Sequence, residues 1–306
     1  MARMASSSKL KGIACIIASA TGFAFMGAFV RLCDDFGSPV SSFQKSFFRN
    51  IVAFLVALAV FARSRSRKDD AGKSSPPGPW SDRRAASKAA ALLLLRSVAG
   101  TVGIFGNFYA LSNIPVGEAM ALNKTAPFFT VFLSWLFLRE KAGMRTVFAL
   151  LAAFAGVVLV MKPGFRADGA VFATLCGLAG GFGAGLAYTC VRELALLNVE
   201  SSMIVLVFSA FSSVASIPFA IASGVCRMNF SQVLVMLGAG VAASVGQFGV
   251  TAAYRFAPSR EIAVFDYTGV VFTAILGFMF FGQVPDAASV AGFAAIVFAA
   301  AYCARR

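Results

Sequence analysis

The sequence predicts an all-α integral membrane protein with ten transmembrane helices in two inverted five-helix repeats. Three observations support this fold class: the composition, ten apolar runs, and a similarity between the two halves of the chain. Of the 306 residues, 59% are hydrophobic and 13% are charged, whereas an average soluble domain is about half apolar and about a quarter charged. The alternating ten-residue patterns of membrane β-strands are missing, so the predicted spans are helices.

Ten apolar runs divide the chain, and most of them approach the roughly 20 residues that a helix needs to cross about 30 Å of hydrocarbon. The fifth, sixth and tenth runs are short or interrupted. Basic residues precede the first run, as in a secretory signal, but its apolar part exceeds the usual ~7–15 residues, which favours an uncleaved span. The runs lie near residues 12–32, 42–62, 89–111, 117–138, 146–162, 170–190, 203–223, 232–254, 261–282 and 287–304.

The net charge of +14 is distributed unevenly along the chain. Of the 27 lysines and arginines, 19 lie in loops on one side of the predicted membrane, eight of them in residues 63–88. Such an excess marks the cytoplasmic side, so we predict a plasma-membrane protein with both termini in the cytoplasm. The segment 63–88 is predicted to be a solvated, poorly ordered loop. The basic charge thus reflects topology, and nucleic acid is not an expected partner.

The residue types that common catalytic sites need are largely missing. Histidine is absent, which removes Ser-His and Cys-His nucleophile pairs as well as the commonest metal ligand and proton relay. The six cysteines lack metal-ligand or CxxC spacing and are interpreted as small buried hydrophobes. These features argue against an enzyme, a metal site or a cofactor.

The two halves of the chain resemble each other at fixed offsets. Residues 97–162 align with 240–305 at an offset of 143, with nine identities across two spans, and the first two spans recur at offsets of 160 and 161. We therefore predict two five-helix repeats, 12–162 and 170–304, the first of which contains the loop 63–88. Because five is odd, the second repeat is inverted. Inverted repeats are typical of secondary transporters, which bind substrate near the midplane between the repeats.

A family resemblance follows from these segments. The stretch FYALSNIPVGEAMALNKTAPFFTVFLSWLFLREK is similar to the pattern of the EamA-type branch of the drug/metabolite transporter superfamily, and the resemblance covers nearly the whole chain. The second half departs from it, because GQVP at 282–285 replaces the acidic end Arg139-Glu140. The resemblance implies a basket-like bundle with a central cavity and alternating access. It does not identify the substrate, because members carry amino acids, other metabolites or drugs, and relatives carry nucleotide sugars.

Polar residues at the repeat-equivalent positions 123–124 and 266–267 are the first candidates for substrate binding. Asn123 and Lys124 in the first half correspond to Asp266 and Tyr267 in the second, so the halves share the position but not the chemistry. A zwitterion could place its carboxylate on Lys124 and its amine on Asp266, and without substrate the two charges would neutralise each other. The alternative is that Lys124 extends along the helix to the membrane interface.

Three further polar residues within predicted spans are candidates for substrate binding. Asn107 and Gln247 lie about one helical turn apart in the repeat alignment, and Tyr188 lies in the sixth span. These side chains could line a shared cavity, although hydrogen bonding between helices explains them equally well. Three cations near the ends of their spans, Lys45, Arg49 and Arg96, are instead expected to reach the membrane interface or lipid headgroups.

Two glutamates and a proline mark the corresponding helices of the two halves. Glu118 and Glu261 each follow a proline by three residues and are predicted to complement the dipole at a helix start. Coupling of transport to protons is the alternative role for them, and Asp266 is the third candidate for that role, because intramembrane acids are commonly functional. Pro127, in the middle of the fourth span, is predicted to kink its helix.

The favoured function is that of a secondary transporter, an exporter or exchanger of a small polar, amino-acid-like or otherwise zwitterionic metabolite. Two alternatives remain open at this point. One is transport of a nucleotide-sugar or nucleoside-like metabolite, with aromatic residues stacking on a base. The other is a non-transporting membrane scaffold or receptor on the same fold. The expected partners are the lipid bilayer and a small-molecule substrate, and a homodimer is left open.

Overall fold

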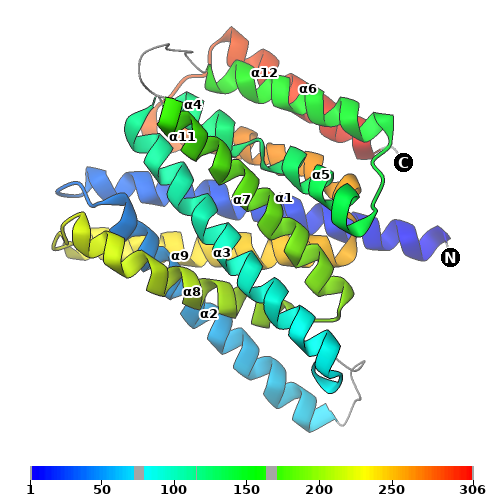
Figure 1. Cartoon of the computed structure of the whole chain (residues 1–306). Coiled ribbons are helices and arrows are strands. Elements are labelled where there is room, and N and C mark those ends of the chain that lie inside the picture. The colour runs from blue at the N-terminus through cyan, green and yellow to red at the C-terminus, as the bar shows by residue number, and fades with distance from the viewer. Residues whose placement is uncertain (1, 72–78, 115, 163–170, 305–306) are drawn as a thin grey trace.

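The computed structural model describes residues 2–71, 79–114, 116–162 and 171–304, and these residues form helices and no strand. Figure 1 shows the arrangement along the chain. The elements are α1 (Ala2–Asp35), α2 (Ser42–Ala71), η1 (Pro79–Ser81), α3 (Arg83–Asn113), α4 (Val116–Asn123), α5 (Ala126–Leu138), α6 (Met144–Met161), α7 (Val171–Leu196), α8 (Ser201–Ala222), α9 (Phe230–Phe256), α10 (Ser259–Ile262), η2 (Ala263–Tyr267), α11 (Thr268–Phe281) and α12 (Ala287–Ala304).

The described residues contain ten segments that are long and apolar enough to cross a membrane. They coincide with the ten predicted runs and confirm a multi-pass helical membrane protein. Eight segments are single helices, whereas α4 with α5 and α10 with η2 and α11 form the remaining two. Large apolar side chains on the outer faces of the spans are exposed, including Val214, Val241 and Phe298, which places apolar surface against lipid.

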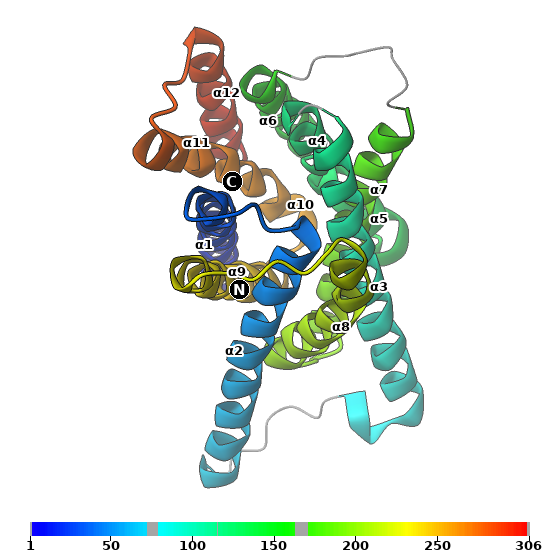
Figure 2. The same cartoon turned by 90° about the vertical axis from the view of Figure 1, so that its left-hand side faces the viewer.

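The helices pack in pairs that join the first half of the chain to the second. In Figures 1 and 2, α1 lies along α9, α3 along α7, α2 beside α8, and α6 beside α12. In the repeat alignment, α1 corresponds to α7 and α9 to α3, so the pair of α1 with α9 corresponds to the pair of α7 with α3. The pairs of α2 with α8 and of α6 with α12 each join two corresponding helices. The beginning of α1 and the end of α12 lie at the same end of the bundle (Figure 1), which we call the termini end.

Glycines allow the closest of these helix approaches. A Cβ atom on Gly22 would lie 2.8 Å from the backbone nitrogen of Gly246, so α1 and α9 touch backbone to backbone. A Cβ atom on Gly183 would lie 3.1 Å from the backbone nitrogen of Gly103, where α7 meets α3. Small residues at helix contacts are typical of membrane bundles. The two contacts occupy matching positions, since Gly22 and Gly183 differ by the offset of 161, and Gly103 and Gly246 by that of 143.

The same correspondence recurs at a neighbouring pair of glycines. Gly249 lies against the carbonyl oxygen of Cys15, and Gly106 lies against the carbonyl oxygen of Cys176. These four residues are again related by the offsets of 143 and 161. Both halves therefore use one type of contact at the positions that the sequence alignment pairs.

The charged segment 63–88 differs from its prediction. Its described parts are mostly helical, because α2 continues to Ala71 and α3 already begins at Arg83. Asp82 caps α3, since its carboxylate accepts hydrogen bonds from the backbone N–H groups of Arg84 and Ala85, which satisfies donors that a helix start leaves free. The prediction of a poorly ordered loop was wrong for these parts. Residues 72–78 lie outside the described residues.

Candidate functional site

Both halves interrupt a membrane-spanning helix at the predicted site. In the first half, α4 ends at Asn123 and α5 begins at Ala126, with a turn at Lys124 and Thr125 between them. Pro127 is the second residue of α5, and because it lacks an N–H group it cannot donate a hydrogen bond back to the preceding turn. Pro127 was predicted to kink the fourth span, and the structure instead divides this span into two helices just before the proline.

In the second half, the 3-10 helix η2 separates α10 from α11 and ends at Tyr267, which corresponds to Lys124, whereas Thr268, which corresponds to Thr125, is the first residue of α11. The residue at the position of Pro127 is Val270, so this interruption arises without a proline. Discontinuous helices at corresponding positions of two halves are characteristic of transporter binding sites, because the unpaired backbone groups and side chains face a shared interior.

Lys124 and Asp266 meet where these two interruptions face each other. The Nζ atom of Lys124 lies 3.3 Å from Oδ2 of Asp266, and their side chains are 20% and 14% exposed, respectively. The Nζ atom also lies 3.6 Å from the position of a Cβ atom on Gly269, which packs against Ala20 of α1. Lys124 therefore points into the bundle and pairs with the opposite half instead of reaching the membrane interface.

The residues next to this pair differ in accessibility. Asn123 is half-buried at the end of α4. Tyr267 is fully buried, and its ring packs in an apolar cluster with Val157 of α6 and Ile296 of α12. Its hydroxyl is a buried group without a hydrogen-bond partner in the described part of the chain. Tyr267 is thus a packing residue in this conformation, and its predicted contact with substrate would need a rearrangement.

Tyr188 on α7 is half-buried and stacks on Tyr254 of α9. Their ring centroids are 5.6 Å apart with an interplanar angle of 28°. The charge of Asp266 acts electrostatically on both tyrosines. The stacked pair is thus close enough to Asp266 to be affected by its charge, and the role of Tyr188 in substrate binding stays a prediction.

Asn107 and Gln247 have different surroundings. The Oε1 atom of Gln247 accepts a hydrogen bond of 2.9 Å from Nη2 of Arg96. Asn107 lies in the contact of α3 with α7, where its backbone nitrogen is 3.1 Å from the position of a Cβ atom on Gly180, and its Oδ1 is buried without a recorded partner among the described residues. Gln247 therefore pairs with Arg96, which was predicted to reach the membrane interface.

Arg49 and Arg96 are the functional candidates that sequence reasoning missed. Both were expected to reach the membrane interface, and both expectations are wrong, because the residues are only 8% and 2% exposed. Arg96 lies 13 residues into α3, with its guanidinium carbon 3.6 Å from the ring centroid of Phe208. The signal that could have found them is charge itself, since intramembrane cations usually face the bundle interior.

Lys45 also differs from its predicted role. Its side chain is buried, and Nζ lies 2.5 Å from Oδ2 of Asp34 at the end of α1. It is therefore neutralised within the protein and does not extend to lipid headgroups. The carboxylate of Asp34 on the neighbouring helix α1 explains the direction of this side chain.

Glu118 and Glu261 lie in the first turns of α4 and α10, as predicted, and both are half-buried. A carboxylate in a first helical turn interacts favourably with the helix dipole. Their positions are confirmed, whereas a role in coupling stays a prediction.

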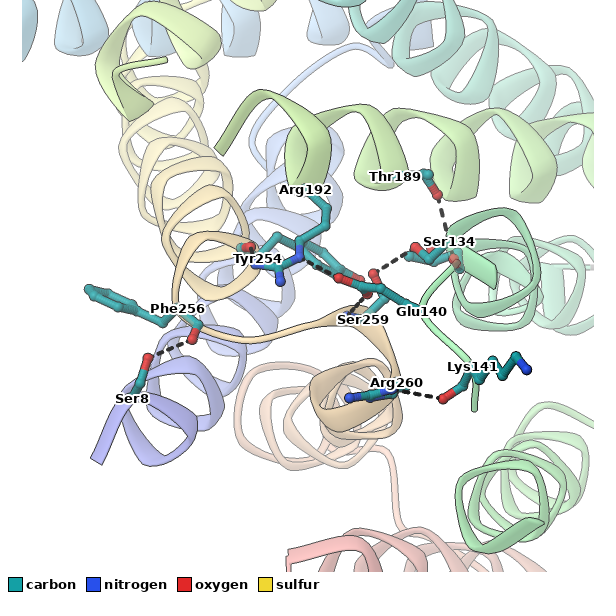
Figure 3. A network of polar contacts seen from close by, with 11 residues as sticks. Ser8, Ser134, Glu140, Lys141, Thr189, Arg192, Tyr254, Phe256, Ser259 and Arg260 are labelled. Carbon is teal, nitrogen blue, oxygen red and sulfur yellow. Dashed lines mark hydrogen bonds and ion pairs between the residues drawn. The ribbon is translucent and has the colours of Figure 1, made fainter. Parts of the chain in front are cut away.

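At the termini end, a network of polar contacts joins the two halves (Figure 3). Glu140, which follows α5, accepts hydrogen bonds from Nε of Arg192 at 2.8 Å and from the backbone nitrogen of Ser259 at 3.1 Å. Arg192 also donates to the carbonyl oxygen of Tyr254 at 2.9 Å. The Arg192 and Glu140 side chains are each 13% exposed. This network ties the ends of α5, α7 and α9 together in a largely buried place.

At the opposite end, Arg31 and Gln283 occupy the matching positions. With the Gln283 amide oriented so that its oxygen faces the guanidinium, Oε1 accepts from Nη1 and Nη2 of Arg31 at 2.6 and 3.2 Å. Arg31 and Arg192 differ by the offset of 161, and Glu140 and Gln283 by that of 143. Arg31 and Gln283 are both exposed. The same pair of positions thus forms a half-buried ion pair at one end and an exposed contact with a single charge at the other.

Several known transporters are similar in sequence to this chain. The pseudopaline exporter CntI of Pseudomonas aeruginosa is 32% identical over 208 residues, which are 68% of this chain and 72% of the exporter. A riboflavin transporter of Vibrio cholerae is 29% identical over 215 residues, 68% of this chain and 70% of that protein. A crystal structure that is 20% identical matches with a TM-score of 0.76 over 97% of this chain and 96% of the other, which shows the fold alone.

This protein is a multi-pass helical bundle, and its relatives are named as transporters or exporters. It is therefore a transporter by class. The profile of the EamA-like transporter family matches residues 10–162. The chain belongs to the EamA-like transporter family. The resemblance predicted from the sequence is confirmed, and so is the expectation that the protein is not an enzyme.

Proposed function

We propose that this protein is a secondary transporter that exports or exchanges a small polar, zwitterionic metabolite across the plasma membrane by alternating access. The observation that carries the proposal is the Lys124–Asp266 ion pair, which joins the two halves where each interrupts a membrane-spanning helix. A permanent structural ion pair would not need two broken helices around it, whereas a binding site that opens to each side does.

The pair suits a solute that carries both charges. The carboxylate of a zwitterion would bind to Lys124 and its amine to Asp266, so the bound solute replaces the attraction between the two side chains. Because each side chain belongs to a different half, binding changes the contact between the halves. A ligand can shift a conformational equilibrium only through such a difference in contacts between the two states.

The remaining architecture supports alternating access between inverted repeats. The glycine contacts of α1 with α9 and of α7 with α3 occupy matching positions, as do Arg192–Glu140 and Arg31–Gln283. In this proposal the termini end faces the cytoplasm, because most basic loop residues lie there, and bacterial relatives are consistent with the plasma membrane. Each Arg contact then acts as a gate at one membrane face.

Counterflow in reconstituted vesicles tests the proposal. A metabolite library is screened for solutes whose labelled uptake accelerates when the unlabelled solute is present on the far side. We expect Lys124→Ala and Asp266→Asn each to abolish this counterflow while the protein remains folded in the membrane. The matched control is Lys162→Ala, which removes the exposed Lys162–Asp286 ion pair between the same two halves and should leave counterflow unchanged. Normal counterflow by both central variants would end the proposal.

Proton coupling is tested by the same vesicles under a pH gradient. Without histidine, coupling depends on Asp266, Glu118 or Glu261. If Asp266 carries the proton, a gradient accelerates uptake by the wild type but not by Asp266→Asn, while Glu118→Gln and Glu261→Gln respond as the wild type does. A gradient that has no effect on the wild type assigns the protein to solute exchange instead.

A second candidate substrate is a ring-bearing metabolite of nucleoside-like size. The stacked Tyr188–Tyr254 pair beside Asp266 favours it, because aromatic side chains stack well on planar rings. A riboflavin transporter among the relatives is consistent with it. Loss of ring-solute counterflow in Tyr188→Leu, with full activity in Tyr188→Phe, would support this candidate over an aliphatic zwitterion.

A further inference from the structure

Two buried arginines near the proposed site have only neutral partners among the described residues. Both Nε and Nη2 of Arg49 donate to Oδ1 of Asn50, and Nη1 faces the sulfur of Met26 at 3.3 Å. Arg96 donates from Nη2 to Gln247 and lies over the ring of Phe208. Its Nε is a buried donor without a partner in the described part of the chain.

Within the described part of the chain, this arrangement leaves the charges of Arg49 and Arg96 without a carboxylate partner. Three other buried or half-buried cations of the bundle are each paired with an acid: Lys45 with Asp34, Lys124 with Asp266, and Arg192 with Glu140. An isolated buried charge is costly, and neutral hydrogen bonds or an aromatic ring compensate it only in part. Arg49 and Arg96 therefore lack a negatively charged partner, which would be a second anionic group besides Asp266.

The two arginines share one neighbour that connects them to the ion pair. Both arginines also meet α8, because Arg96 lies over Phe208 and Asn50, the partner of Arg49, donates to Oγ of Ser212 at 2.9 Å, one helical turn further along. The charges of Arg49, Arg96 and Asp266 are all close enough to act on the hydroxyl group of Tyr188. The cluster is formed by α2, α3, α7 and η2, so it belongs to both halves of the chain. With Lys124 included, it contains three cations and one anion.

The arginines are also specific to the first half. At the offset of 143, Arg96 corresponds to Ala239, and at the offset of 160, Arg49 corresponds to Ser209. Features that both halves need for packing, such as the glycine contacts, recur at matching positions. A charge present in only one half is expected of residues that bind an asymmetric solute.

We propose that Arg49 and Arg96 bind an anionic group of the transported solute, a carboxylate or a phosphate, beside Tyr188. This inference rests on the proposed transport function and narrows its substrate class to solutes with more negative than positive groups. Guanidinium suits this task, because its planar array of five N–H donors matches carboxylate and phosphate oxygens. The free Nε of Arg96 supplies a donor for that contact.

Thermal unfolding of the purified protein tests the anion site without knowledge of the natural solute. The probes are succinate, inorganic phosphate and the neutral succinamide, at an ionic strength held constant with chloride. We expect succinate or phosphate to raise the unfolding temperature of the wild type by a few degrees, and succinamide to leave it unchanged. The anion that acts distinguishes a carboxylate site from a phosphate site, because ligands that bind only the folded form stabilise it.

Charge-removing variants assign the effect to the two arginines. Arg49→Gln and Arg96→Gln should each lose the anion-dependent shift, whereas Arg145→Gln, which removes an exposed arginine, should keep it. Without any anion, the two central variants should unfold at the wild-type temperature or above, because an unneutralised buried charge is gone. The inference is overturned if neither anion exceeds succinamide, if the shift survives in both variants, or if both variants unfold earlier without anion.

The same preparations separate this inference from the transport proposal. Vesicles that show counterflow of a neutral solute, together with no anion effect on unfolding, would retain the transporter and remove the anion site. An anion shift that depends on Arg49 and Arg96, in a protein that exchanges no solute, would retain the anion site and remove the transport proposal.

Discussion

At the scale of single residues, comparison of the two halves predicted the central contact better than depth in the membrane did. The aligned positions of Lys124 and Asp266 differ in chemistry, which predicts a role for both residues, and the structure brings their charged atoms to 3.3 Å. Arg49 and Arg96 were misplaced because their distance from a helix end suggested the interface. Sequence gives the depth of a residue along a helix, but the neighbouring helix that covers it depends on tertiary packing.

The exposed Lys162–Asp286 pair provides a residue-scale prediction about pH. The Lys162 ammonium and the Ser289 hydroxyl and backbone N–H hold the pKa of Asp286 below its usual range. A depressed pKa means that the favourable interaction is present above the usual aspartate pKa and is lost only as pH falls through the lowered value. Between pH 5 and 8 the Asp286 carboxylate therefore stays ionised.

We accordingly expect Asp286→Asn to leave the pH profile of counterflow unchanged between pH 5 and 8. The measurement is the counterflow rate of wild type and variant in buffers of equal ionic strength. A profile that flattens in Asp286→Asn would contradict this assignment.

At the scale of elements, the two interruptions show what local sequence can and cannot predict. Pro127 indicates a disturbed helix in the fourth span, and α5 begins at the preceding residue, Ala126. Nothing comparable marks residues 263–267, where a 3-10 helix forms with Val270 at the proline position. Its cause is tertiary, because the buried Val264 and Tyr267 pack into the apolar cluster with α6 and α12.

The glycine contacts give a prediction at the same scale. Gly22→Ala should destabilise the contact of α1 with α9, because its Cβ atom would lie 2.8 Å from the backbone nitrogen of Gly246 and 2.9 Å from the carbonyl oxygen of Ala242. Backbone atoms cannot move aside easily, and overpacking typically costs about 1–3 kcal/mol. The measurement is the unfolding temperature in detergent.

Gly27→Ala is the matched control on the same helix. A Cβ atom on Gly27 would have nothing within 4 Å, and alanine favours a helix over glycine. We expect this variant to unfold at the wild-type temperature or slightly above it. Equal behaviour of the two variants would show that the close approach of α1 and α9 does not support the fold.

At the scale of the whole molecule, the sequence predicted the ten spans from the lengths of the apolar runs. It also predicted which positions of the two halves correspond, because the two halves are similar in sequence. The sequence did not predict that the polar contact at the termini end is stronger than the matching contact at the opposite end. That difference follows from burial, since Arg192 and Glu140 are largely shielded whereas Arg31 and Gln283 are exposed. Shielded charges interact more strongly than charges in water. The termini end is therefore expected to be the more firmly closed end in the resting protein.

The two ends can be compared by measuring spin-label distances in a background without the six native cysteines. Labels at Lys141 and Asn198 report on the termini end, and labels at Asp35 and Val284 on the opposite end, all at exposed positions. Each label pair joins one half of the chain to the other. Removing the charge of Glu140 weakens the contact at the termini end, and adding a negative charge at Gln283 strengthens the contact at the opposite end. Both changes should favour the conformation that is open at the termini end.

The distance distributions of Glu140→Gln test alternating access most directly. Hydrogen bonds to charged groups contribute about 1.5–3 kcal/mol, and about 1.4 kcal/mol is a tenfold change in an equilibrium constant. We therefore predict that Glu140→Gln lengthens the Lys141–Asn198 distance and shortens the Asp35–Val284 distance in a population at least about tenfold larger than in the wild type. Distances that stay unchanged at both ends, or that lengthen together, would contradict a carrier whose two ends open in turn.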